Sequence, residues 1–150
     1  FHVIGPIETL ELDVELRNIF EVAVRQGTIQ YFNKTVNVKP YLQAADIFVL
    51  PTYREGRSKA ILEAMAMKMP VITCDVAGCR GLVVDGINGF LVKERDSDSL
   101  YLAMVKMCGF SYAMLDKMGE ESRRIVVDQY ELNKVQTQYL QVLEEHIILR

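Results

Sequence analysis

Residues 44–67 have the sequence AADIFVLPTYREGRSKAILEAMAM, in which a short apolar run, Ile47–Leu50, is followed by a turn and a helical segment, Ser58–Met67. The run has little polar alternation, which is typical of a strand covered on both faces. From residue 60 to residue 67 the helix is apolar on every side except at Glu63, so we expect it to be buried and Glu63 to be partly buried. A buried strand followed by a buried helix indicates an α/β protein.

The same alternation continues on both sides of this stretch. Short runs of Val, Ile and Phe alternate with segments whose apolar residues recur at helical spacing. This order predicts an α/β fold with a Rossmann-like parallel sheet and helices on both faces. Further strands are expected at Phe1–Gly5, Ile29–Phe32, Val71–Cys74 and Gly89–Val92, and further helices at Asp13–Arg25, Lys39–Ala45, Asp96–Met107 and, as a pair, Ala113–Ile148.

Length and composition indicate one globular domain with one core: 150 residues, 50% hydrophobic and 25% charged. A net charge of −3 gives no electrostatic reason to expect a nucleic-acid partner. No apolar run approaches the roughly 20 residues that span a bilayer, and the residues from Phe1 on do not lead us to expect a signal peptide. The odd set of Cys74, Cys79 and Cys108 fits a reducing cytosol. The two histidines, His2 and His146, lie far apart and no CxxC pair occurs, so no metal site is expected.

Ligands of open parallel sheets bind outside the carboxyl ends of the strands. Four strand exits are therefore candidates for a site: Gly5-Pro6, Asn33-Lys34, Pro51–Gly56 and Asp75–Gly78. None contains GxGxxG or GKS/GKT, which argues against a dinucleotide or a nucleoside-triphosphatase site.

The third exit carries the strongest pattern, because Glu55 and Gly56 precede a helix whose first free amides come from residues 57–59. Free amides at a helix N-terminus attract anions such as a diphosphate, and Gly56 lets a ligand approach the backbone. Arg57 and Lys59 either contact that phosphate or are solvated surface charges. Ser58 either faces the ligand or only caps the helix. Glu63 either accepts bonds from ligand hydroxyls, such as a ribose pair, or forms an ion pair with a nearby Lys or Arg.

Glu55 and Glu63 match the E-x7-E motif of retaining glycosyltransferases of family 4, which have the GT-B fold of two facing Rossmann-like domains. The resemblance covers residues 29–98 closely. It extends through residues 44–51, 53–56, 62–66, 70–73, 75–80 and 85–92. The Tyr-Arg-Glu-Gly and Gly-Cys-Arg segments are similar to the branch that builds bacterial capsules, O-antigens and related surface polysaccharides.

The resemblance implies that this chain holds a nucleotide sugar, often a UDP-sugar, in half of a GT-B fold. Glu55 is then the catalytic-site residue that contacts the sugar, and Glu63 binds ribose hydroxyls. Amides from Gly56 to Ala60 face the sugar and diphosphate, and the exits at Gly5, Asn33-Lys34 and Thr52 complete the donor site. The family also implies transfer of a hexose-type sugar with retention, no divalent metal and no cofactor.

Four features depart from the family pattern. Arg57 and Ser58 stand where small, proline or apolar residues are frequent, and Gly81 replaces a frequent glutamate. Lys68 stands where glycine commonly ends the helix, and a left-handed lysine there costs about 1 kcal/mol. The family's domain begins with one further strand and a Gly-Arg…Lys stretch whose cations hold the diphosphate, and this sequence begins after this point.

The chain starts at Phe1 and not at a methionine, so we expect part of a longer protein. Residues 1–150 are then the nucleotide-sugar-binding C-terminal domain without its first strand, and the acceptor domain lies outside them. The expected partners are the donor, that N-terminal domain, and a glycan or lipid-linked acceptor at the membrane surface. The expected location is the cytoplasm, or the inner face of the membrane. On this interpretation the part is inactive alone.

Other functions give the same alternation of strands and helices. A catalytically silent nucleotide-sugar-binding module stays open, because the missing half decides between it and an enzyme. Another GT-B enzyme, such as a sugar-nucleotide epimerase, fits the E-x7-E segment and the Asp75–Arg80 segment less well. A phospho-receiver needs an aspartate after its third strand, where this chain has Leu50-Pro51-Thr52. The donor sugar, the base and the acceptor also stay open.

Overall fold

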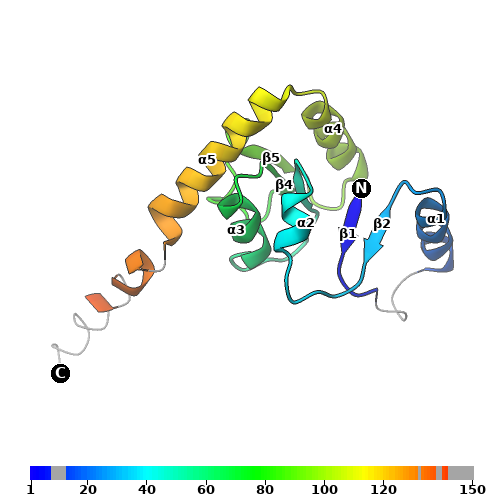
Figure 1. Ribbon diagram of the computed structural model, residues 1–150, viewed down its shortest axis with the longest axis horizontal. Helices are drawn as coiled ribbons and strands as arrows, with labels where there is room; N and C mark the ends of the chain where they lie inside the picture. Colours follow the sequence, from blue (N-terminus) through cyan, green and yellow to red (C-terminus); the bar gives the residue numbers. More distant parts are fainter. Residues whose placement is uncertain (8–12, 132, 138–139, 142–150) are drawn as a thin grey trace. The chain divides into compact units, whose positions relative to one another are not determined.

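A computed structural model describes residues 1–7, 13–131, 133–137 and 140–141 of the chain (Figure 1). The chain divides into two compact units, Phe1–Ala45 and Asp46–Arg150. Every strand pair in the described residues is parallel, and so are the isolated bridges. The predicted α/β class with parallel strands is therefore confirmed.

Unit 1 is built around a two-stranded parallel sheet. Strands β1 (His2–Ile4) and β2 (Gln30–Phe32) pair in register from His2↔Gln30 to Ile4↔Phe32. Helix α1 (Val14–Arg25) lies between them in sequence, as a parallel pair requires. The short helix α2 (Lys39–Gln43) follows and contains Leu42. Among the described residues of this unit, Leu42 is the one hydrophobic residue that is buried.

Unit 2 contains the larger sheet, with the strand order β3-β4-β5. The strands are β3 (Phe48–Leu50), β4 (Val71–Cys74) and β5 (Gly89–Val92). The helices are α3 (Lys59–Ala66), α4 (Ser97–Cys108) and α5 (Tyr112–Tyr130). Because all three strands run parallel, the loops after them meet at one edge of the sheet.

The core of unit 2 has two parts, one on each face of the central strand β4. Every residue of β4 is buried, and alternate residues point to opposite faces. Val71 packs with Ile61 and Met65 of α3 and with residues of α5. Ile72 packs instead with β5 and α4. Helices on both faces are therefore confirmed for this sheet, and α5 runs beside α3 (Figure 1).

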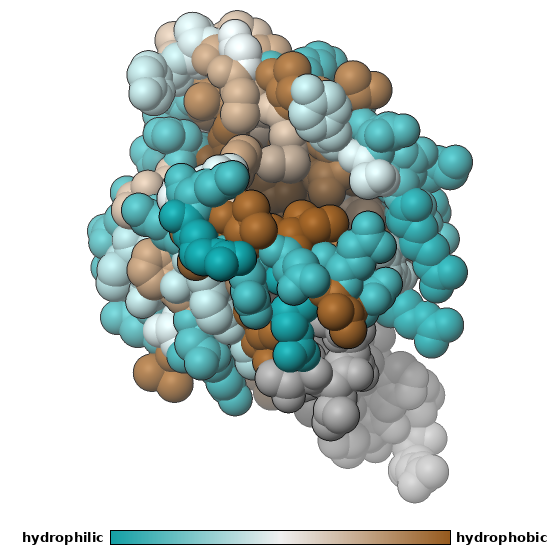
Figure 2. Space-filling model, turned by 90° about the vertical axis from the view of Figure 1, so that its right-hand side faces the viewer, coloured by the Kyte–Doolittle hydropathy of each residue, from teal (hydrophilic) through white to brown (hydrophobic). Residues whose placement is uncertain are grey.

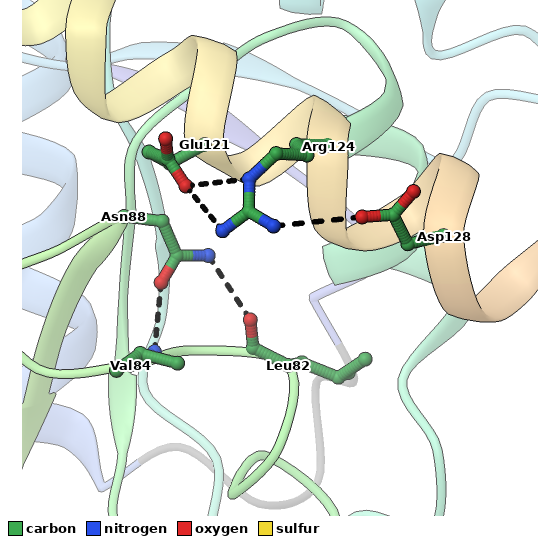
Figure 3. Close-up of polar contacts among 6 residues, drawn as sticks. All are labelled: Leu82, Val84, Asn88, Glu121, Arg124 and Asp128. Atoms are coloured by element: carbon green, nitrogen blue, oxygen red, sulfur yellow. Dashed lines mark hydrogen bonds and ion pairs between the residues drawn. The ribbon is translucent and has the colours of Figure 1, made fainter.

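The turn that leads into β5 is held by a buried asparagine, Asn88 (Figure 3). Its side-chain oxygen accepts a hydrogen bond from the Val84 amide at 2.7 Å, and its side-chain nitrogen donates to the Leu82 carbonyl at 3.0 Å. The buried side-chain amide of Asn88 is therefore satisfied and fixes the start of β5.

Figure 3 also shows Arg124 on α5, which forms ion pairs with Glu121 at 2.7 Å and Asp128 at 3.5 Å.

Most predicted elements are confirmed to within about two residues, but one expectation differs from the structure. A single sheet with one core was expected, whereas the strands form two sheets in two units. The reason is that β1, β2 and α1 contain no buried residue, so the apolar core lies in unit 2. Of the predicted helix pair, α5 is present and residues 133–137 are helical, and the rest lies largely outside the described residues.

Exposed hydrophobic residues occur on helices of both units. Four lie on α1: Val14, Leu16, Ile19 and Val22. In the view of Figure 2, hydrophobic side chains lie open to solvent between hydrophilic ones. Within the described residues, no helix combines the length and the apolar character needed to cross a bilayer.

Candidate functional site

The loop after β3, residues 51–58, packs tightly against the loop after β4. Gly78 lies so close to the backbone of Glu55 and Gly56 that an added Cβ would collide with both carbonyl oxygens. Glu55 is half-buried and Gly56 is exposed. Close backbone packing of this kind requires glycine at position 78. The structure therefore holds Glu55 and Gly56 at the carboxyl edge of the β3-β4-β5 sheet.

Glu63 lies in the second turn of α3, and its side chain is 39% exposed. Its recorded partner is Lys59, whose Nζ lies 3.6 Å from Oε1 and whose side chain is 90% exposed. An exposed pair four residues apart contributes only about 0.3–0.5 kcal/mol. The ion pair that the sequence left open thus exists, but it leaves the Glu63 carboxylate accessible. The prediction that Glu63 is partly buried is confirmed.

Helix α3 begins at Lys59, with Ser58 as its N-cap residue. The Ser58 side chain makes no capping hydrogen bond, although its carbonyl accepts from the Leu62 amide at 3.1 Å. Capping, the simpler role considered for Ser58, is therefore not its role in this structure. The first-turn amides are those of Lys59 and Ala60 onward, one to two residues later than expected. They give this edge of the sheet a partial positive charge suited to an anion.

Three arginines near this edge already have partners in the protein. The Arg57 guanidinium lies over the Tyr130 ring at 5.0 Å, and that of Arg95 lies over the Tyr53 ring at 5.4 Å. Arg80 donates from Nε to Asp75 at 2.6 Å, and this contact holds the pKa of the Asp75 carboxyl below its usual range. Arg57 is thus not simply a solvated charge.

Two buried thiols lie beneath the site. Thr73 donates its hydroxyl to the Leu50 carbonyl at 2.9 Å and lies 3.3 Å from the Cys79 sulfur. Burial, and secondarily the Glu55 charge, raises the pKa of the Cys79 thiol. Burial likewise raises the pKa of Cys74. Both thiols stay protonated near neutral pH, so they act as packing groups and not as nucleophiles.

The predicted residues of unit 1 lie together at the carboxyl ends of β1 and β2. The Gly5 amide donates to the Phe32 carbonyl at 3.1 Å, and the Gly5 carbonyl accepts from the Tyr31 hydroxyl at 2.8 Å. The Asn33 side chain accepts from the Lys34 amide at 2.7 Å. The Gly5 amide and carbonyl therefore both have hydrogen-bond partners within unit 1, whereas the Asn33 and Lys34 side chains are exposed.

In unit 2 the remaining predicted residue, Thr52, is half-buried and donates its hydroxyl to the Arg54 carbonyl at 3.4 Å. Sequence reasoning included the exit at residues 75–78 but missed that Gly78 supports Glu55. It also missed Arg95 altogether. No local pattern pairs residues this far apart, and the only signal for Gly78 was its position after a buried strand.

No group of three or more His, Cys, Asp or Glu side chains that could hold a metal ion occurs among the described residues. The arrangement instead combines two half-buried glutamates, Glu55 and Glu63, with the uncapped start of α3. Carboxylates accept hydrogen bonds from ligand hydroxyls, and helix amides bind anions. This chemistry suits a ligand that carries both hydroxyls and phosphate.

Comparison with known proteins gives one family and one fold. The family model described as "Glycosyl transferases group 1" matches residues 1–109. The UDP-Gal:alpha-D-GlcNAc-diphosphoundecaprenol alpha-1,3-galactosyltransferase of Escherichia coli is 34% identical over 93 residues, which cover 62% of this chain and 24% of that enzyme. The chain thus spans about a quarter of that relative.

Two solved structures have the same fold. Anabaena HepE in complex with UDP matches with a TM-score of 0.83 at 19% identity, over 96% of this chain and 40% of HepE. HepE has also been solved with UDP-glucose. The C-terminal domain of the group 1 protein LpcC from Francisella tularensis matches with a TM-score of 0.67 at 23% identity, over 80% of this chain and 65% of that domain.

Proposed function

Because the chain belongs to the group 1 family of glycosyl transferases, and has the fold of the C-terminal half of GT-B enzymes, we propose that it binds a UDP-sugar at the carboxyl edge of the β3-β4-β5 sheet. The bound donor then supplies a hexose-type sugar to a polysaccharide or lipid-linked acceptor. The observation that carries the proposal is the placement of Glu55 and Gly56 against Gly78, directly before the uncapped start of α3.

Each part of the donor has a group suited to it. The diphosphate faces the first-turn amides of α3, whose partial positive charge and free N–H groups stabilise phosphate oxygens. Glu63, one turn further along α3, accepts bonds from the ribose hydroxyls. Glu55 contacts the sugar. That Gly5, Asn33 and Lys34, all in unit 1, border the base stays a prediction from the sequence.

The proposed reaction keeps the configuration at the anomeric carbon. The bond from that carbon to the diphosphate oxygen breaks while a bond to the acceptor oxygen forms on the same face of the sugar. The proton of the acceptor hydroxyl passes to the departing diphosphate. The helix amides stabilise the charge that develops on this leaving group, so no divalent metal is required.

The relatives support a proposal about the acceptor. The E. coli enzyme named above acts, according to its name, on an acceptor carrying diphosphoundecaprenol. We extend this class to the present chain and propose a lipid-linked acceptor at the cytoplasmic face of a membrane. The acceptor would be held by an N-terminal domain joined to this one.

The test is a titration of the ¹⁵N-labelled chain with UDP and with UDP-glucose, with and without EDTA, followed by amide chemical shifts. We expect the largest changes at residues 55–60 and at Glu63, and no effect of EDTA. Glu55→Gln should weaken UDP-glucose more than UDP, because UDP lacks the sugar that Glu55 contacts. Changes confined to the amino ends of the strands, near Met69 and Asn88, would contradict the proposed site.

A further inference from the structure

Arg95 has an unfavourable backbone conformation, with φ at 57°. It lies in the loop that joins β5 to α4, at the same edge of the sheet as Glu55. A residue with a side chain is strained in this left-handed region, and such strain persists only where the surroundings or the function require it. Within the described residues, one other non-glycine residue has positive φ, namely Lys68 at 60°.

The strain at Lys68 has a structural explanation. Lys68 follows the C-terminus of α3, where a left-handed residue is common. Its Nζ lies 2.6 Å from Glu120 on α5, and its carbonyl packs against Gly119. The left-handed lysine therefore joins α3 to α5.

The Arg95 side chain takes no part in closing the turn in which it lies, residues 94–95. The Lys93 amide donates to the Ser99 hydroxyl at 3.2 Å, and Asp96 caps α4 through the Ser99 amide at 2.9 Å. Lys93 and Asp96 also form an ion pair at 3.7 Å. These contacts anchor both ends of the loop and leave the Arg95 side chain available for a contact outside the loop.

The recorded partner of the Arg95 guanidinium is the Tyr53 ring, 5.4 Å away. Tyr53 is 56% exposed and lies two residues before Glu55. On the other side of Glu55, Arg57 lies over the Tyr130 ring at 5.0 Å. Two cation–π contacts therefore flank the part of the loop that rests on Gly78.

We propose that Arg95 is a positioning residue for the sugar of the donor: it holds Tyr53 and thereby fixes the loop that presents Glu55. The inference rests on the proposed function, since Glu55 is the group that contacts the sugar there. Arg95 acts through Tyr53 and touches no reacting atom. The strained backbone is retained because it aims the guanidinium at the ring.

The experiment compares Arg95→Gly with the parent chain and with Lys68→Gly as a matched control. Both substitutions relieve a left-handed backbone, so we expect the Tm of each to stay level or to rise. Arg95→Gly should lower the affinity for UDP-glucose by about two- to fivefold, the range that an exposed cation–π contact supports. It should leave the affinity for UDP unchanged within error. Lys68→Gly should change neither affinity.

Two further variants test the route through Tyr53. Tyr53→Leu should lower the affinity for UDP-glucose to the same extent, and the double variant with Arg95→Gly should show no further loss of affinity. Arg95→Lys should keep part of the affinity, because a lysine can also lie over the ring. In the ligand-free chain, Arg95→Gly should shift the amide signals of residues 53–55.

The outcomes separate this inference from the proposed function. If the parent chain shows no UDP or UDP-glucose shifts at residues 55–60, the proposed function fails. If the parent binds both and Arg95→Gly binds UDP-glucose equally well, the inference fails alone. Equal losses in Arg95→Gly and Lys68→Gly, or additive losses with Tyr53→Leu, would also overturn it. Should Arg95→Gly not fold, Arg95→Lys and Tyr53→Leu decide the question.

Discussion

Glu63 shows how far sequence reasoning reaches at a single residue. The apolar surroundings on its helix predicted a partly buried carboxylate, and the structure has it 39% exposed beside Lys59. Lys68 stands where glycine commonly ends the helix, and the structure gives it the left-handed φ of 60° whose cost the sequence analysis considered. Both follow from neighbours within one or two helical turns. The role of Gly78 does not, because it depends on residues more than 20 positions earlier.

Substitution of Glu63 separates donor binding from stability. Glu63→Gln should weaken UDP by about 1–3 kcal/mol, the scale of a hydrogen bond to a charged group, while the free energy of unfolding changes little. Lys59→Ala is the control: it removes the ion pair but keeps the carboxylate, so UDP affinity should hold. Calorimetric titration and urea unfolding measure the two quantities. A large loss of stability with unchanged UDP affinity would instead assign Glu63 a structural role.

Two glycines of the site should differ in how much stability they lose when replaced by alanine. In Gly78→Ala the new methyl group collides with the carbonyls of Glu55 and Gly56, so we expect a loss of about 1–3 kcal/mol in stability, the usual cost of overpacking. In Gly56→Ala the methyl group meets nothing within 4 Å, and stability should change by less than about 0.5 kcal/mol. Urea unfolding of both variants measures this; equal stabilities would mean that the two loops are not packed together.

At the scale of elements, the order of strands and helices could be predicted, but their pairing could not. Apolar runs such as Val71–Cys74 are local signals, and the observed strand has those bounds. The sequence did not predict that the two parallel strand pairs of unit 2 would be separate from β1 and β2. Pairing depends on which helix faces bury apolar area, and α1 buries no residue.

The close contact between α3 and α5 can be tested by whether an added methyl group raises or lowers the free energy of unfolding. Gly119 lies within α5, where alanine is favoured over glycine by about 1 kcal/mol on helix propensity alone. An added Cβ would, however, collide with the Lys68 carbonyl. We therefore expect Gly119→Ala to lower the free energy of unfolding by about 1–3 kcal/mol. Lys117→Ala, at an exposed position of the same helix, should change it by less than about 0.5 kcal/mol. Stabilisation by Gly119→Ala would show that the helices are further apart.

For the whole molecule, the family and the fold were predicted correctly and the single core was not. The E-x7-E segment and its surroundings resemble the family strongly enough to identify it, because many residue types recur in one order. The division into two units depends on burial summed over many residues. Among the described residues of unit 1, Leu42 is the one buried hydrophobic residue, whereas unit 2 contains both core clusters. Length alone does not reveal that imbalance.

The chain alone should bind UDP weakly and transfer no sugar. It spans 24% of the E. coli galactosyltransferase and 40% of HepE, and we propose that the acceptor is held outside residues 1–150. Transfer requires both reactants to be held in line, so a donor site without an acceptor surface leaves the barrier high. Binding is weak because the recorded partners of Arg57 and Arg80 are Tyr130 and Asp75, which leaves mainly helix amides for the diphosphate.

A panel of nucleotide sugars with lipid-linked acceptors measures this directly, with the full-length E. coli relative as the positive control. We expect UDP shifts that saturate only at high ligand concentration, and no transfer above background. A charged hydrogen bond to the diphosphate is worth about 1.5–3 kcal/mol. The absence of two, one each from Arg57 and Arg80, therefore lowers the affinity for UDP by roughly two to four orders of magnitude. Robust turnover by residues 1–150 would mean that the chain holds its own acceptor, because no donor site transfers a sugar to an acceptor it does not orient.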